Sequence, residues 1–365
     1  MRDLFILGAG FSANAGLPIQ SEFTRRLISA GTETSKDDPT RAVLPFLRDF
    51  ISQAFGHLQS AKAEYWPDLE DIFTCIDLSA NTGHNLGRQF APAELRTVRR
   101  ALITRIVAML RCEYDKALSA PPREWGGLET FFANVNVKDC AFVNLNWDSV
   151  VEERVSDLHG PIDLDYGCGA KAALFGKKLE IALATERPQQ KLLITKMHGS
   201  VNWLYCDCCR RVFWFPPKRS MEIARQILKA KEWDKIDDGF WHTESTCCYC
   251  QGAVLGTRLA TFTYLKALDS PMFQKSWFSA DRLLRSAKRW IFIGYSLPGA
   301  DYEFKYLLKR VQLSRKIPPE IIIITKGRRS ALTYSNYQRF FGLVVKKPNF
   351  FPYGLSKPAL ERVFG

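Results

Sequence analysis

The stretch DLFILGAGFS, residues 3–12, decides the fold of this chain. Its first five residues form an apolar run that predicts a short buried strand, and a glycine turn follows at once. Residues 12–28 then have the pattern of a helix. A loop that binds phosphate requires this context, because glycine permits the tight turn and the N-terminus of a helix attracts an anion. By itself the pattern Gly8-x-Gly10-x-x-Ala13 is weak evidence, since glycine turns after strands are common.

Four further apolar runs have the same character as the first. They cover residues 140–145, 192–197, 290–294 and 320–325, and helical patterns separate them. Runs this apolar are typical of strands that are buried on both faces of a parallel sheet. The predicted fold class is therefore α/β: a Rossmann-like parallel sheet with helices on both faces.

Two regions are expected to interrupt this sheet. Residues 35–125 contain long amphipathic stretches, at 41–54 and 92–117, which predict an inserted helical module. Residues 204–254 contain paired cysteines and predict a small zinc-binding module. We therefore expect one domain over residues 1–365 that carries these two insertions.

Polar residues suited to chemistry follow two of the apolar runs. Asn146 and Asp148 come after the run that ends at residue 145, and His198 comes after the run that ends at residue 197. Ligands of open α/β sheets bind outside the carboxyl ends of the strands, so these side chains are expected to face one pocket. Imidazole has a pKa near neutrality, which favours a catalytic base over a turn residue at His198. Asp148 could instead cap the helix that begins near Ser149.

A third polar segment, Gly294-Tyr295-Ser296, follows the run at residues 290–294 and could close a nucleotide pocket. Ser296 could equally cap a helix that starts near Asp301. A dehydrogenase is disfavoured, because no acidic residue ends a second strand where it would hold the adenine ribose.

Five motifs in the same order resemble the sirtuins. GAGFS at 8–12 with GLP at 16–18 is similar to the opening motif of that family. NLNWD at 144–148 stands where the family has Thr-Gln-Asn-Ile-Asp, and KMHGS at 196–200 is similar to its catalytic His-Gly segment. Paired cysteines follow His198, as the sirtuin zinc module does. IGYSLP at 293–298 takes the place of the Gly-Thr-Ser segment.

The resemblance implies a nucleotide-binding fold that breaks the bond between nicotinamide and ribose in NAD. Asn146 and Asp148 would hold the nicotinamide ribose and the attacking group, and His198 would be the general base. The cofactor-binding residues implied by position are Gly8, Ala9, Gly10 and Ser12 at the diphosphate, Gly294 and Ser296 at phosphate or adenine ribose, and Thr325 with Lys326 beside the adenosine.

Six of the ten cysteines lie in two short clusters, CDCC at 206–209 and CCYC at 247–250. Cys206-x2-Cys209 and Cys247-x2-Cys250 have the spacing that lets two thiolates bind one zinc ion. Four cysteine ligands leave no open position for water, so the predicted zinc is structural. A pair of disulfides is the alternative, and it is disfavoured in a cytoplasmic protein. Cys208 and Cys248 leave the choice of ligands open.

The sequence departs from the sirtuin deacylases at two places. Pro18 is followed by Ile19-Gln20-Ser21, where the deacylases have Asp-Phe-Arg, and residues 259–266 lack the Phe-Gly-Glu-type strand that holds an acetyl-lysine peptide. A chain that has an NAD site but no peptide groove resembles the sirtuin-like effectors of bacterial anti-phage defence, which hydrolyse NAD. The leading hypothesis is an NAD glycohydrolase (an NAD⁺ nucleosidase) that forms nicotinamide and ADP-ribose. The alternatives are an NAD-dependent protein deacylase or ADP-ribosyltransferase, and a non-catalytic sensor of NAD or ADP-ribose.

Composition limits the partners that we expect. The net charge of +13, from 51 basic and 38 acidic residues, raises the prospect of an acidic partner such as nucleic acid. The basic residues come in doublets and not in long runs, so direct nucleic-acid binding is not favoured. No apolar segment approaches the roughly 18 residues of a membrane span, and residues after Met1 lack a signal-peptide pattern. A cytoplasmic protein without a membrane partner is expected.

Control of the activity is also expected, because an unregulated NAD hydrolase would kill its host. Homo-oligomerisation or a separate activating protein would supply this control, and the candidates are an ATPase, an Argonaute-like protein and a phage component. The sequence leaves open the trigger, the oligomeric state, any residual deacylase activity and the preference for NAD over NADP.

Overall fold

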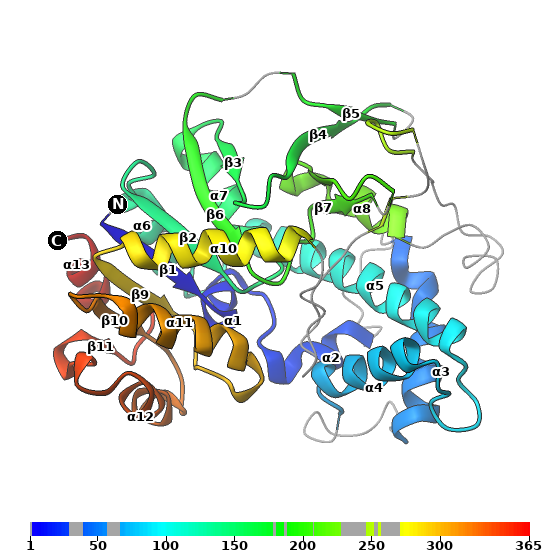
Figure 1. Ribbon diagram of the computed structural model, residues 1–365, viewed down its shortest axis with the longest axis horizontal. Helices are drawn as coiled ribbons and strands as arrows, with labels where there is room; N and C mark the ends of the chain where they lie inside the picture. Colours follow the sequence, from blue (N-terminus) through cyan, green and yellow to red (C-terminus); the bar gives the residue numbers. More distant parts are fainter. Residues whose placement is uncertain are drawn as a thin grey trace.

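The computed structural model describes residues 2–28, 39–56, 66–177, 180–185, 188–206, 208–227, 246–251, 255–256 and 271–365. At its centre lies a seven-stranded sheet in which every neighbouring pair of strands is parallel (Figure 1). The strand order is β11 (Phe350–Phe351), β10 (Glu320–Ile324), β9 (Arg289–Ile293), β1 (Asp3–Leu7), β2 (Cys140–Asn144), β6 (Lys191–Lys196) and β3 (Asp163–Asp165). The five strands predicted from apolar runs are β1, β2, β6, β9 and β10, and each ends within one residue of its predicted bound.

The carboxyl ends of the five central strands form one straight edge. Leu7 pairs with Asn144 on one side and with Ile293 on the other. Asn144 in turn pairs with Lys196, and Ile293 pairs with Ile324. After β6 the chain crosses β2 and β1 to reach β9, so the strand order reverses at β1. Ligands of open α/β sheets bind at such a reversal.

Helices cover both faces of the sheet, as the α/β prediction requires. Leu4 and Ile6 of β1 belong to one buried cluster, whereas Phe5 and Leu7 belong to another. The cluster around Leu4 includes residues of α10 (Pro271–Ser286), α11 (Tyr302–Ser314) and α12 (Ser330–Phe341). The cluster around Phe5 includes residues of α6 (Trp125–Asn134), α7 (Val150–His159) and α13 (Lys357–Phe364). Alternate residues of a strand point to opposite faces, so β1 contributes to both layers of the core.

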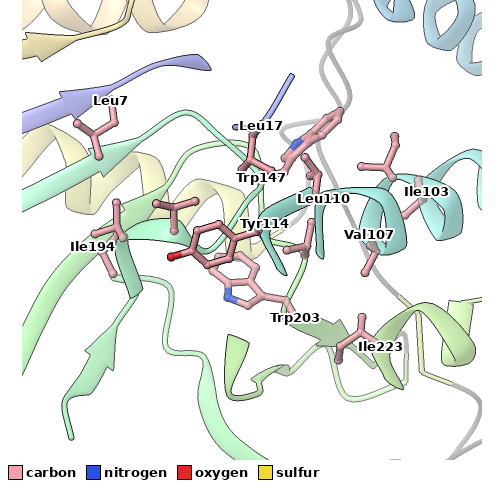
Figure 2. Close-up of a cluster of buried hydrophobic side chains, with 14 of the residues drawn as sticks. Leu7, Leu17, Ile103, Val107, Leu110, Tyr114, Trp147, Ile194, Trp203 and Ile223 are labelled. Atoms are coloured by element: carbon pink, nitrogen blue, oxygen red, sulfur yellow. The ribbon is translucent and has the colours of Figure 1, made fainter. Parts of the chain in front are cut away.

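Helices fill most of the described chain between β1 and β2. They are α1 (Ala9–Ser12), α2 (Gln20–Ile28), α3 (Val43–Phe55), α4 (Leu69–Thr82), α5 (Pro92–Ser119) and α6, which was described above. Every residue of α5 from 101 to 111 is buried, which is the pattern of a helix that is surrounded by protein. Figure 2 shows Leu110 and Tyr114 of this helix in the same buried cluster as Trp147 and Trp203. The bounds of the insertions remain a prediction.

The helix predicted over residues 12–28 is wrong in its first half. A short 3₁₀ turn, Ala13–Ala15, ends at Gly16, which adopts a left-handed conformation with φ 78°. Pro18 follows, and α2 begins at Gln20. Glycine takes the left-handed conformation at little cost, and proline has no N–H for a helical hydrogen bond. The chain therefore turns between two separate helices.

A second, four-stranded sheet lies beside the first. Its strand order is β5 (Ile181–Leu183), β4 (Lys171–Phe175), β8 (Val212–Trp214) and β7 (Trp203–Tyr205), and α8 (Ser220–Ile227) follows β8. The turn between β7 and β8 carries the first cysteine pair. In the part of the chain that the structure describes, we find no helix with the length and hydropathy of a membrane span.

Candidate active site

A pocket of about 870 Å³, part of it open solvent, lies at the carboxyl edge of the central strands. Eight of the residues predicted from sequence line it, and they come from four separate segments of the chain. They are Gly8, Ala9, Ser12, Asn146, Asp148, His198, Gly294 and Ser296.

Three of these side chains form a continuous set of hydrogen bonds. The Ser12 hydroxyl donates to Asp148 Oδ2 at 2.7 Å. Asn146 Nδ2 donates to Ser12 Oγ at 2.8 Å and to the Gly8 carbonyl at 2.9 Å. A carbonyl only accepts hydrogen bonds, so this contact fixes which end of the Asn146 amide is the NH₂ group. The orientation of Asn146 is therefore set by the glycine loop.

Asp148 has the capping role that the sequence left open, in addition to its contact with Ser12. Its Oδ1 accepts a hydrogen bond from the Val150 backbone N–H at 3.2 Å, at the start of α7. Only Oδ2 contacts Ser12, so the two interactions use different oxygens. The side chain still lines the pocket and is 7% exposed.

His198 is buried and is held from two sides. Its Nδ1 lies 3.1 Å from the Leu145 carbonyl, and because that oxygen only accepts, Nδ1 carries a proton. The Trp147 indole donates to the His198 carbonyl at 3.1 Å. In the neutral ring the basic nitrogen is then Nε2, which lies 3.8 Å from Asp301 Oδ1. The imidazole thus has the tautomer that a general base on the pocket side requires.

Sequence reasoning missed Asp301 as a site residue. It lies in a short 3₁₀ turn, Gly299–Asp301, five residues after Ser296, and its side chain lines the pocket. Its Oδ2 accepts a hydrogen bond from the Tyr295 hydroxyl at 3.2 Å. Burial raises the pKa of Tyr295 well above its ordinary value, so this hydroxyl keeps its proton and remains a donor. The sequence signal that could have identified Asp301 was its position in the same loop as Ser296.

The loop that carries Asp301 has a strained backbone. Leu297 is buried and has φ 56°, a conformation that residues other than glycine rarely adopt. Strain of this kind costs of order 1–3 kcal/mol and persists only where the surrounding structure imposes it. Here the turn at Leu297 places Tyr295 and Asp301 within hydrogen-bonding distance of each other.

The glycines of the two loops pack against each other. The Gly10 amide donates to the Gly294 carbonyl at 3.0 Å. A Cβ atom on Gly294 would lie 2.1 Å from the Phe11 nitrogen, and one on Gly8 would lie 2.6 Å from the Gly294 oxygen. Gly10 adjoins this contact and does not line the pocket. A Cβ atom on Gly10 would lie 2.9 Å from the Gly294 Cα, so this glycine permits the close approach of the loop after β9. Its predicted contact with a phosphate remains a prediction.

A buried ion pair lies behind Asp148. Lys196 Nζ is 3.5 Å from Glu152 Oε1, and both side chains have no exposed surface. The same ammonium donates to the Asp148 carbonyl. Burial raises the pKa of Glu152, and the charge of Lys196 opposes this shift. Lys196 is the single charged residue of the run at residues 192–197, and this was the sequence signal for the pair.

The pocket does not extend to the two residues predicted beside the adenosine. Thr325 and Lys326 follow β10, which lies on the far side of β9 from β1. Lys326 Nζ instead pairs with Glu124 at 2.6 Å. Their role in nucleotide binding remains a prediction.

Residues from the helices between β1 and β2 complete the wall of the pocket. Leu69 and Glu70 lie at the start of α4, Leu110 on α5, and Gln20 and Phe23 on α2. No local pattern marks them as site residues, because helix packing alone brings them to the sheet edge. Residues 259–266, where the peptide-binding strand of the deacylases was sought, lie outside the described residues.

The two cysteine pairs converge on one point. The Sγ atoms of Cys206, Cys209, Cys247 and Cys250 all lie within 4.8 Å of one another. Those of Cys206 and Cys250 are 3.7 Å apart, as are those of Cys209 and Cys247. Zinc–sulfur bonds of about 2.3 Å in a tetrahedron place sulfurs roughly 3.8 Å apart, so the four thiols fit zinc. None of the ten cysteines, all within the described residues, forms a disulfide.

Both cysteine turns have the same backbone geometry. The Arg210 amide donates to the Cys206 carbonyl at 2.8 Å, and the Gln251 amide donates to the Cys247 carbonyl at 2.9 Å. Arg210 and Gln251 each have φ 57°. In each pair the residue after the second cysteine is therefore left-handed, and its amide closes a hydrogen bond to the carbonyl of the first cysteine. Cys208 is exposed and Cys248 half-buried, and neither belongs to the four-sulfur cluster.

Comparison with known proteins adds little to this geometry. The chain matches no protein-family model and no curated protein. Among solved structures it is similar to a crystal structure of Sir2 in complex with the inhibitor EX-527, 2'-O-acetyl-ADP-ribose and a deacetylated p53 peptide. The alignment covers 90% of this chain and 82% of the other, at 12% identity and a TM-score of 0.32. A TM-score of this size supports no conclusion, so the fold rests on the strand order and the site on the pocket.

Proposed function

We propose that this chain is an NAD glycohydrolase that cleaves NAD to nicotinamide and ADP-ribose. The observation that supports it is the convergence of Asn146, Asp148 and His198 on one pocket, together with the glycine loop that follows β1. A pocket that only bound a nucleotide would not need an amide, a carboxylate and an imidazole around the same space. The sequence motifs that resemble the sirtuins point to the same chemistry.

In this proposal the glycosidic bond breaks with its electron pair leaving on the nicotinamide nitrogen. The ribose carbon becomes cationic, and fixed dipoles and the carboxylate of Asp148 stabilise the positive charge. Asn146 holds the ribose, since its amide is already oriented by Ser12 and Gly8. His198 accepts the proton of the attacking water at Nε2, because Nδ1 carries a proton toward Leu145.

The cysteine cluster has a structural part in this proposal. Cys206, Cys209, Cys247 and Cys250 would hold zinc, and the ion would cross-link the β7–β8 turn to residues 246–251. All four ligands are protein sulfurs, so the ion takes no part in bond cleavage. Residues 1–365 then form one NAD-cleaving domain with a helical insertion at about 35–125 and a zinc-binding insertion at about 204–254.

The cellular role that we propose is an effector of anti-phage defence in the cytoplasm. Activity would be held in check until a homo-oligomer forms or a separate activating protein binds. An ATPase, an Argonaute-like protein or a phage component would fill that second role. The basis is the resemblance in sequence and the toxicity of uncontrolled NAD loss.

The experiment is an assay of nicotinamide release from NAD by the purified, zinc-containing protein, measured with each candidate activator present. We expect release by the wild type, and a loss of roughly 100-fold or more in Asn146→Ala and in His198→Ala. Lys191→Met, on the exposed end of β6, is a control outside the pocket. If the protein deacetylates lysine peptides, and releases nicotinamide only when such a peptide is present, the deacylase is favoured. NAD binding without turnover, with every candidate activator present, would favour the sensor.

A further inference from the structure

Asp301 faces the base of the proposed reaction across a short gap. Its Oδ1 lies 3.8 Å from His198 Nε2, and both side chains line the pocket. This separation is too long for a direct hydrogen bond. The separation is one that a single bridging oxygen atom, at the usual hydrogen-bond length of about 2.8 Å from each atom, would span.

The geometry points to Asp301 as a second catalytic residue, which holds the attacking water together with His198. This inference rests on the proposed NAD hydrolysis and assigns the position of its water. A water molecule donates one hydrogen to Nε2 and the other to Oδ1, so both acceptors are used and its lone pairs face away from them. The water is thereby oriented toward the pocket, where Asn146 and Asp148 would hold the ribose.

A hydrogen bond to the other carboxylate oxygen, Oδ2, holds the Asp301 side chain in place for this task. The Tyr295 hydroxyl donates to Oδ2 at 3.2 Å, and the Tyr337 hydroxyl donates to the Tyr295 carbonyl at 2.9 Å. Tyr295 is 5% exposed and Tyr337 is fully buried. The carboxylate is 6% exposed, so its charge acts at short range with little screening by solvent.

The proton balance of the step follows from this arrangement. The bond between the ribose carbon and the nicotinamide nitrogen breaks, and its electron pair neutralises the pyridinium. The water oxygen forms the new bond to carbon, and one of its protons moves to Nε2 of His198. The imidazolium that forms faces Asp301, whose negative charge stabilises it. Release of that proton to solvent restores the base, and ADP-ribose and nicotinamide leave.

The test separates attack by water from cleavage of the glycosidic bond. Two rates are measured for the wild type and for Asp301→Asn: formation of ADP-ribose, and exchange of labelled nicotinamide into NAD. Exchange requires bond cleavage but no water. We expect Asp301→Asn to lower ADP-ribose formation roughly 100-fold while exchange persists. Glu303→Gln removes a charge two residues away and outside the pocket lining, and it should leave both rates unchanged.

Two outcomes of this test would overturn the assignment. Unchanged ADP-ribose formation in Asp301→Asn would show that the carboxylate is not needed, and an equal loss of both rates would show that it serves binding or folding. A wild type that releases no nicotinamide with every candidate activator present would instead contradict the proposed function. In that case a crystal structure of the wild type with ADP-ribose still decides the position of the water. An ordered water within about 3 Å of both Nε2 and Oδ1 supports it, and its absence overturns it.

Discussion

The carboxyl edge of the central sheet and the cysteine cluster both join residues that are far apart in the chain, but different forces hold them. At the sheet edge, Gly10 and Gly294 touch through their backbones, and hydrogen bonds link Ser12 to Asn146 and Asp148. In the cluster, four sulfurs lie near one another without a covalent bond between them. The difference teaches that hydrogen bonds and backbone contacts of the fold hold the first site together, whereas the second brings together four sulfurs whose spacing fits a metal ion.

The largest expected effect is at the ion pair behind the sheet edge. Lys196→Met leaves Glu152 buried without a counter-ion, and breaking a buried pair in this way costs roughly 3–5 kcal/mol. The free energy of unfolding in urea measures the loss. Lys191→Met on the same strand is the control, because its ion pair with Asp165 is exposed and should contribute less than about 1 kcal/mol.

The loss in Lys196→Met is expected to depend on pH. Glu152 faces Lys196, Asp148 and Tyr166, and burial raises its pKa. A raised pKa in the folded state contributes stability at low pH, and this contribution is lost as the pH rises through that pKa. Without Lys196 the carboxyl group can still be buried in its neutral form, so the variant should lose less stability at pH 5 than at pH 8. A loss that is the same at both values would contradict the role of Glu152.

A second prediction concerns the backbone contact between the two loops. In Gly294→Ala the new Cβ would lie 2.1 Å from the Phe11 nitrogen, at a residue whose φ is 64°. Strain and displacement together should destabilise the protein by roughly 3 kcal/mol. Urea unfolding measures this loss.

Gly299→Ala is the matched control for that contact. It changes the same residue type in the same loop, where a Cβ would meet no atom within 4 Å. Its free energy of unfolding should stay within about 0.5 kcal/mol of the wild type. Similar losses in both variants would show that the loop, and not the contact with the first glycine turn, is sensitive.

The third prediction tests the cysteine cluster. Cys247→Ser removes one of the four sulfurs and should weaken zinc binding by about 100-fold, or roughly 2.7 kcal/mol. Cys208→Ser changes an exposed thiol outside the cluster and should retain one zinc per chain. Metal analysis after dialysis against a chelator measures both. Full zinc retention in Cys247→Ser would mean that the four sulfurs do not share an ion.

The sequence predicted the parts of the fold that depend on short segments. Apolar runs such as residues 140–145 gave strands within one residue of their bounds, because a strand that is buried on both faces consists mostly of apolar residues. Residues 12–28 were misjudged, because the helical pattern hid the break that Gly16 and Pro18 impose. Candidate site residues were found where they directly follow a strand, as Asn146 and His198 do.

What the sequence could not supply is the set of contacts between segments. Asp301, Glu70 and Leu110 reach the pocket through the turn at Leu297 and through helix packing, neither of which has a local signature. The role of Gly10 was also beyond local reasoning, since its neighbour Gly294 is far away in the chain.

By itself the sequence determined the buried strands, the glycine turn and the two cysteine pairs, because each depends on residues that are neighbours in the chain. Tertiary structure alone decided that Leu7 is in register with both Asn144 and Ile293. That register sets the ends of the strands side by side, and it brings an imidazole, an amide and a carboxylate from separate segments to one pocket. Packing of side chains on both faces of the sheet holds the register, and packing is a property of the whole molecule.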